Sequence, residues 1–235
     1  MKRPLVLISD FALVLISNFC FLILLCVSVS LWPSLASAQT LDQVVASIGN
    51  TAITQSDVDA EYRFEVFLTE GHLPASPPDA ATFARVRDRL IDQRLLTQEA
   101  AAEGIQPEDV HQAAERRLTD ARKKCKSEDA FQSSLRSLGL TEAQLLDRLA
   151  EQERTLRMID QRMRPSVTVE PAEIEAYYRD TFTPDYSKHN PGEAVPPLAQ
   201  VESQIREVLA QKKIDQQLAA WLNELKVTHH VRLEQ

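Results

Sequence analysis

The strand-like segments of this chain lie toward its two ends, with helical patterns between them, and this placement limits the folds open to it. Residues 44–53 resemble two short strands joined at 49–50 by Gly-Asn, a pair suited to a two-residue hairpin turn. Residues 227–233 carry Val231 and Leu233 at alternate positions, as in a half-buried strand. A lone hairpin is only marginally stable. We therefore expect the tail to add a third strand to the hairpin.

The region between these strands carries helix start signals and helical periodicity. Thr54 with Asp57, and Thr141 with Gln144, have the spacing of residues that cap a helix start. Helices are predicted at about 54–68, 81–103, 107–125, 127–139, 141–164, 171–182 and 198–225. The predicted fold class is mainly α, a helical domain with a small β-sheet formed by the N-terminal hairpin and the C-terminal strand.

One apolar stripe is clearer than the others. Its spacing alternates between four and three residues, which predicts one buried helical face. The stripe is formed by Leu145, Leu149, Gln152, Leu156, Ile159 and Met163.

Residues 183–197 are rich in proline and are interpreted as a linker between residues 39–182 and 198–235. The helix that follows this connector is nevertheless expected to join the same core, because it carries many apolar side chains. These are Val201, Ile205, Val208, Ile214, Leu218, Trp221 and Leu225.

The first 38 residues have the three parts of a secretory signal peptide. A short cationic start is followed by an apolar run at 11–31 and by Ala-Ser-Ala at 36–38. Cleavage after Ala38 and a periplasmic location are predicted. The apolar run is also long enough to span a bilayer, so an uncleaved inner-membrane anchor is the alternative. Only that alternative would give the protein a membrane contact.

Charge and cysteine content narrow the functional classes. Removing residues 1–38 takes away Lys2, Arg3 and Asp10, which leaves 24 basic and 33 acidic side chains and a net charge of −9. A chain so acidic has no evident nucleic-acid footprint. Cys125 would be the single cysteine left after cleavage, so an internal disulfide is excluded for the exported chain.

The sequence gives no firm sign of catalysis, and no cofactor or metal is expected. His229 and His230 are adjacent in the strand-like tail, where they would point to opposite faces and could not share a metal. Cys125 ends an apolar seam and is interpreted as an inert core thiol. A redox role is the alternative, because the neighbouring lysines at 123, 124 and 126 could lower the thiol pKa.

Three blocks of this sequence, residues 44–62, 131–178 and 201–233, stand in an order that resembles the SurA-type periplasmic chaperones, relatives of the parvulin-type foldases. Residues 44–62 (VVASIGNTAITQSDVDAEY) are similar to the family's opening hairpin and first helix. Residues 131–178 resemble its later helices, and residues 201–233 resemble its returning C-terminal helix and closing strand. The resemblance implies a holdase that binds unfolded exported polypeptides or outer-membrane protein precursors.

The chain departs from this family at residues 183–197. One or two parvulin-type isomerase domains occupy that place in the family, whereas an independent domain needs at least ~50 residues and this gap has fifteen. A non-enzymatic chaperone is therefore expected. The alternatives are a peptidyl-prolyl isomerase-family foldase and a membrane-anchored structural or assembly subunit.

Aromatic side chains on the first helix and on residues 171–182 suggest where clients would bind. Core packing would explain them as well, because an apolar helix face is usually buried. The functional hypothesis is an apolar groove that takes extended client segments. Its predicted members are Phe64, Phe67, Leu68, Leu73, Tyr178 and Phe182.

Overall fold

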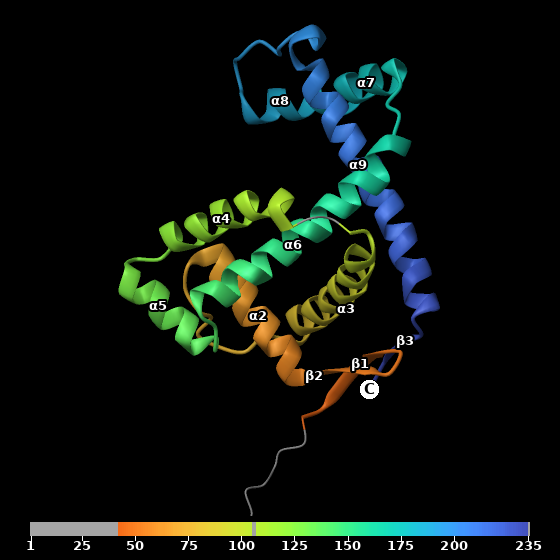
Figure 1. Cartoon of the computed structure of the whole chain (residues 1–235). Helices are drawn as coiled ribbons and strands as arrows, with labels where there is room; N and C mark the ends of the chain where they lie inside the picture. Colours follow the sequence, from red (N-terminus) through yellow and green to blue (C-terminus); the bar gives the residue numbers. More distant parts are fainter. Residues whose placement is uncertain (1–41, 105–106, 235) are drawn as a thin grey trace, which may run out of the picture. The chain divides into compact units, whose positions relative to one another are not determined.

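A computed structural model of the chain describes residues 42–104 and 107–234, and these form mainly α-helices with one small sheet (Figure 1). The predicted fold class is confirmed. The signal peptide, its cleavage site after Ala38 and the alternative membrane anchor lie outside the described residues. The helices are α2 (Gln55–Glu70), α3 (Ala80–Ala102), α4 (Pro107–Lys124), α5 (Glu128–Ser137), α6 (Glu142–Met163), α7 (Pro171–Tyr177), α8 (Thr183–His189) and α9 (Leu198–Thr228).

The sheet joins the two distant strand segments of the sequence. Strands β1 (Val44–Ile48) and β2 (Thr51–Thr54) form the predicted hairpin, and β3 (Val231–Leu233) pairs antiparallel with β1, which gives the order β2-β1-β3. Gly49 adopts a φ of +56°, which suits the first position of the two-residue turn. The predicted third strand is confirmed, although Leu233 is more exposed than a half-buried strand would place it.

Both predicted capping signals begin helices. The Thr54 hydroxyl accepts a hydrogen bond from the Asp57 amide, and the Asp57 carboxylate accepts one from the Thr54 amide. Thr141 and Gln144 make the same reciprocal pair at the start of α6. These bonds satisfy amides that the first turn of a helix leaves without partners. They fix where α2 leaves the hairpin and where α6 begins.

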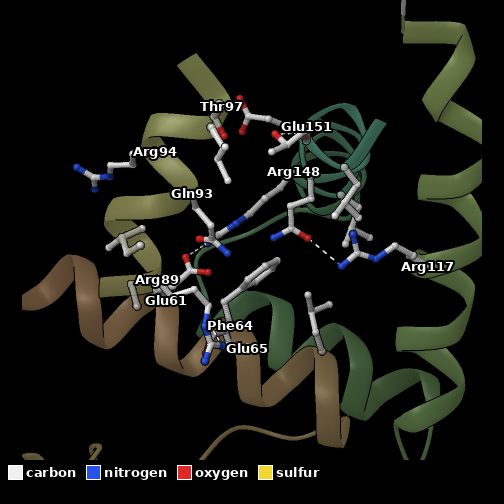
Figure 2. Close-up of a pocket in the computed structure, with 18 of the residues that line it drawn as sticks. Glu61, Phe64, Glu65, Arg89, Gln93, Arg94, Thr97, Arg117, Arg148 and Glu151 are labelled. Atoms are coloured by element: carbon white, nitrogen blue, oxygen red, sulfur yellow. Dashed lines mark hydrogen bonds and ion pairs between the residues drawn. The ribbon is translucent and has the colours of Figure 1, made fainter. Parts of the chain in front are cut away.

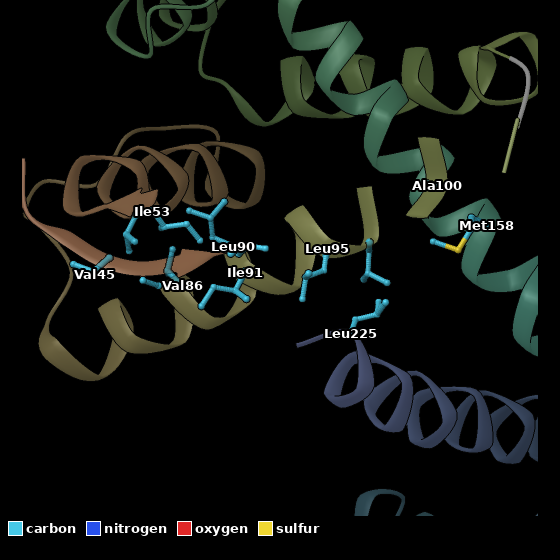
Figure 3. Close-up of a cluster of buried hydrophobic side chains, with 13 residues drawn as sticks. Val45, Ile53, Val86, Leu90, Ile91, Leu95, Ala100, Met158 and Leu225 are labelled. Atoms are coloured by element: carbon cyan, nitrogen blue, oxygen red, sulfur yellow. The ribbon is translucent and has the colours of Figure 1, made fainter. Parts of the chain in front are cut away.

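Three clusters of buried side chains hold the elements together. The first, which we call the sheet-side core, brings together side chains from the sheet, α2, α3, α6 and α9 (Figure 3). The second, the α2–α6 core, lies among α2, α4, α5 and α6, and is formed by Phe64, Phe67, Ala114, Leu118, Phe131, Leu135, Leu145 and Leu149. The third, the α7–α9 core, is formed by Ile174, Val201 and Ile205.

Helix α9 belongs to the fold, as expected, because Leu225 lies in the sheet-side core while Val201 and Ile205 form the α7–α9 core. One predicted member of its buried face is wrong, since Val208 is 48% exposed. The helix also extends beyond its predicted end. His229 therefore caps α9 and His230 takes a φ of +51° in the turn before β3, rather than both lying on a strand.

The proline-rich connector is partly helical, which corrects its interpretation as a linker. Residues 178–182 form a π-helical turn that continues into α8, so regular structure runs to His189. Pro184 lies in the first turn of α8, directly after the π-helical turn. The other prolines of the connector follow the end of α8, at positions 191, 196 and 197.

Candidate functional site

Helices α2, α3, α4 and α6 border a cleft of about 1120 Å³ (Figure 2). Helix α2 packs on both α3 and α4, and α6 packs on the same two helices. The residues that line the cleft range from Asp57 at the start of α2 to Ile159 in the second half of α6. A volume of this size exceeds that of a typical small-molecule pocket, which is about 300–1,000 Å³.

Apolar side chains form part of the cleft wall. Leu156 of α6 is 56% exposed although it borders the cleft. This corrects the prediction of a continuous buried stripe on α6, because Met158 and Met163 are buried while Leu156 faces the open cleft. The other apolar lining side chains are Phe64, Leu68, Leu90, Leu96, Leu149 and Ile159.

A buried ion pair crosses the cleft between α2 and α6. Glu61 is 3% exposed, and its carboxylate accepts a hydrogen bond from the Arg148 guanidinium. The same guanidinium lies 3.6 Å from the centre of the Phe64 ring, a distance that gives cation–π attraction (Figure 2). Among the residues that the structure describes, Glu61 is the one buried charged side chain. The pair and the ring together tie α6 to α2.

The remaining cations of the cleft also bind groups of the protein itself. Arg89 and Arg94 of α3 form ion pairs with Glu65 and Asp57 of α2, at 2.8 and 3.1 Å. The two basic residues of the cleft that are not on α3 or α6 lie on α4.

Arg117 of α4 forms an ion pair with Glu153 at 3.0 Å and donates a hydrogen bond to Gln152 at 2.9 Å, both on α6. The Lys124 ammonium donates to the main-chain oxygen of Leu68 at 2.7 Å. These contacts hold α4 to α6 and to the end of α2.

Comparison with known proteins finds a family that matches the part of the chain that forms the cleft. The SurA-like N-terminal domain family matches residues 9–159, which include every residue that lines the cleft. The chain belongs to the SurA-like N-terminal domain family. The predicted resemblance is therefore confirmed.

A curated relative of this SurA-like domain is Chaperone SurA of Cupriavidus pinatubonensis (strain JMP 134 / LMG 1197). The two are 30% identical over 142 residues, which are 60% of this chain and 28% of that protein. The aligned part thus spans about a quarter of the relative's length.

The structure of the SurA-like domain does not bring the six predicted client-binding residues into one groove. Phe64 and Phe67 are 1% and 0% exposed in the α2–α6 core, where the rings of Phe67 and Phe131 lie 6.0 Å apart. Leu68 and Leu73 pack against that core. Only Phe64 and Leu68 of these four border the cleft.

The other two predicted residues, Tyr178 and Phe182, pack against the α7–α9 core instead. Their rings stack on each other at 5.7 Å, and the Tyr178 hydroxyl donates to the main-chain oxygen of Pro196. The six side chains are thus divided between two clusters, because helical spacing shows which side chains share a face and does not show which element covers that face.

The cleft residues missed from the sequence include Glu61, Arg148 and Leu156. Glu61 had a detectable signal, because it stands in the stripe of Val58, Glu61, Phe64 and Phe67 that α2 buries. A carboxylate in a buried stripe requires a partner. The sequence alone could not identify that partner as Arg148, which lies 87 positions further along the chain.

Two other kinds of chemistry, a metal site and a reactive thiol, can be judged from the described residues. No group of three or more His, Cys, Asp or Glu side chains there could hold a metal ion. Cys125 is half-buried, and burial together with the nearby Glu128 raises the pKa of its thiol, which corrects the alternative that its lysine neighbours lower it. No described helix is both long and apolar enough to cross a membrane.

Burial of Glu61 predicts a measurable pH dependence of stability. Burial raises the pKa of the Glu61 carboxyl, and Arg148 opposes this rise. Protonated Glu61 therefore contributes stability at acidic pH, and that contribution is lost as the pH rises through the folded-state pKa. Glu61→Gln removes the titrating group. The free energy of unfolding of the unaltered protein minus that of Glu61→Gln should fall as the pH rises from acidic toward neutral.

Urea unfolding of both proteins at a series of pH values measures this difference. Glu224→Gln is the matched control, because it makes the same chemical change at an exposed position on α9. A difference that rises with pH for Glu61→Gln would mean that the ion pair with Arg148 outweighs burial.

Proposed function

We propose that this SurA-like domain is a chaperone that holds unfolded polypeptides in the cleft between α2, α3, α4 and α6. The observation that carries the proposal is the position of the cleft. Every residue that lines it lies within the part of the chain that the family matches, and the related protein is named a chaperone. Clients of this class expose apolar side chains along extended segments, and the cleft offers apolar wall residues and room for several side chains.

The proposed clients are exported proteins, including outer-membrane protein precursors, and the proposed location is the periplasm. The signal-peptide pattern of residues 1–38 supports this location, and cleavage after Ala38 stays a prediction. The acidic net charge favours solubility of a complex that carries an unfolded client.

Replacing Leu156 with Ser tests the cleft directly. Leu156 is already 56% exposed, so the change should leave the fold intact while it removes apolar surface that a client would cover. We expect client affinity to fall about fivefold to tenfold, which corresponds to about 1 kcal/mol or slightly more. Suppression of aggregation of an unfolded outer-membrane protein, followed by light scattering, reports the loss.

Val227→Ser is the matched control for this experiment. Val227 is 76% exposed at the end of α9 and does not line the cleft, so the same kind of change there should leave suppression unchanged. Equal suppression by the two variants, with both folded by circular dichroism, would show that clients bind elsewhere.

We further propose that residues 42–234 do not catalyse prolyl isomerisation. Where the family resemblance implies an inserted isomerase domain, this chain has α8 and a short loop before α9. Uncatalysed isomerisation takes tens to hundreds of seconds, so acceleration is easily detected. We expect a proline-containing test peptide to isomerise at the uncatalysed rate in the presence of the purified protein, whereas a parvulin added as a positive control accelerates it. Catalysis that copurifies with the protein would support the foldase alternative.

A further inference from the structure

We propose, on the basis of the function proposed above, that the cleft selects extended client segments in which a lysine or arginine lies beside an apolar side chain. Acidic segments of equal apolarity should bind less well. The inference rests on which charges of the cleft are engaged within the protein and which one is left for a ligand.

The basic side chains of the cleft are all engaged within the protein. Five of them line it, and four form ion pairs with carboxylates of the protein. The fifth, Lys124, donates to a main-chain oxygen at the end of α2, where the helix dipole is negative. An acidic client side chain would have to displace one of these contacts to gain a cation.

Four of the five acidic side chains that line the cleft form ion pairs within the protein, and the fifth forms none with the residues that the structure describes. Asp57, Glu61 and Glu65 pair with arginines of the cleft, and Asp120 pairs with Lys123 at 3.3 Å. Glu151 of α6 also lines the cleft, is exposed, and has no ion-pair or hydrogen-bond partner for its carboxylate among the described residues. It borders the cleft on the side where α6 packs against α3 (Figure 2). A cationic client side chain can therefore bind Glu151 without breaking an existing contact.

Neutral polar groups on the α3 wall of the cleft complete a surface for an extended segment. Gln93, Thr97 and Gln98 of α3 line the cleft, and no other described residue bonds to their side chains. Their amide and hydroxyl groups can bind main-chain N–H and C=O groups, which an extended client leaves unpaired. Leu156, on the same helix as Glu151, offers the exposed apolar contact. The cleft thus presents an apolar, a neutral polar and an anionic contact to one segment.

The net negative charge of the rest of the protein also favours cationic client segments. Basic and acidic side chains are equal in number in the cleft lining, whereas residues 39–235 carry a net charge of −9. The acidic excess therefore lies outside the cleft, where it attracts cationic segments and repels anionic ones over about a Debye length, ~10 Å at 0.1 M salt.

Binding of three synthetic peptides tests the inference. The peptides share one apolar sequence and differ only in the residues that flank it, which are lysine, serine or glutamate. We expect the lysine peptide to bind the purified protein about fivefold more tightly than the serine peptide, as an exposed ion pair allows, and the glutamate peptide to bind least. Fluorescence anisotropy of labelled peptides measures the affinities.

Two variants with the same change in net charge locate the effect. Glu151→Gln should remove most of the lysine preference, whereas Glu224→Gln, on α9 outside the cleft, should retain it. Leu156→Ser should weaken all three peptides alike, because it removes an apolar contact and no charge. A lysine preference that is unchanged in Glu151→Gln overturns the inference.

The remaining outcomes separate the inference from the proposed function. Equal binding of the three peptides overturns the charge selectivity and leaves the chaperone proposal standing. Absence of binding by all three also overturns the inference if the protein still suppresses client aggregation. Absence of both peptide binding and suppression contradicts the proposed function itself.

Discussion

Removing residues 198–235 is expected to unfold the rest of the chain rather than leave a smaller folded domain. The deletion removes α9, whose Leu225 lies in the sheet-side core and whose Ile214 is also buried, and β3, which pairs with β1. Four side chains of α9 are buried, and at ~1.5–3 kcal/mol each their loss amounts to ~6–12 kcal/mol. The net stability of a domain is only ~5–15 kcal/mol. Loss of this helix therefore removes most of the free energy of unfolding.

Thermal unfolding followed by circular dichroism compares a protein of residues 39–235 with one of residues 39–197. In the longer protein Trp221 is the only tryptophan, and its ring lies 4.4 Å from the Arg162 guanidinium. Its fluorescence should shift to the red in a single step that coincides with loss of helix. A cooperative melt of the 39–197 protein at a similar temperature would show instead that residues 198–235 belong to a separate unit.

Replacing Gly71 with Ala is expected to destabilise the fold more than the same change at Gly139 or Gly192. Gly71 ends α2 with a φ of +74°, and an added Cβ would lie 2.3 Å from the main-chain oxygen of Lys124. Main-chain atoms at the end of α4 cannot move aside cheaply, so α2 and α4 would have to separate. We expect a loss of about 4 kcal/mol or more, and a melting temperature lower by about 10 °C or more.

Gly139→Ala is the matched control for the effect of conformation alone. Gly139 has a φ of +68°, yet an added Cβ would meet nothing within 4 Å. It should therefore cost only the penalty of a left-handed backbone, about 1–2 kcal/mol. If the two variants melt at the same temperature, the Cβ added at position 71 meets no costly conflict with the end of α4.

Element boundaries that depend on local chemistry could be predicted from the sequence. The caps at Thr54 and Thr141 needed only residues three positions away, and the hairpin needed only its Gly-Asn turn. The third strand also followed from local patterns, because only one other strand-like segment was available to pair with the hairpin. Local interactions of this kind are encoded within a few residues, whatever the rest of the chain does.

The candidate site could not be predicted in the same way, because it depends on which elements cover which faces. The aromatic face of α2 was identified, but its coverage by α4, α5 and α6 buries Phe67. Leu156 had the spacing of a core residue and is exposed because no helix covers it. Likewise, α8 was missed because proline content was interpreted as a break, whereas the helical backbone of residues 178–182 continues through Pro184.

The pairing of β1 with β3 also bears on the order of folding. Ile48 and its partner Val231 are separated by nearly the whole described chain, so the central strand of the sheet obtains its second neighbour only from the last residues of the fold. A contact so distant in sequence forms late, because a long loop must close before it contributes stability. During synthesis the sheet therefore stays incomplete until the C-terminal strand has emerged, and β1 keeps one edge without a partner until then.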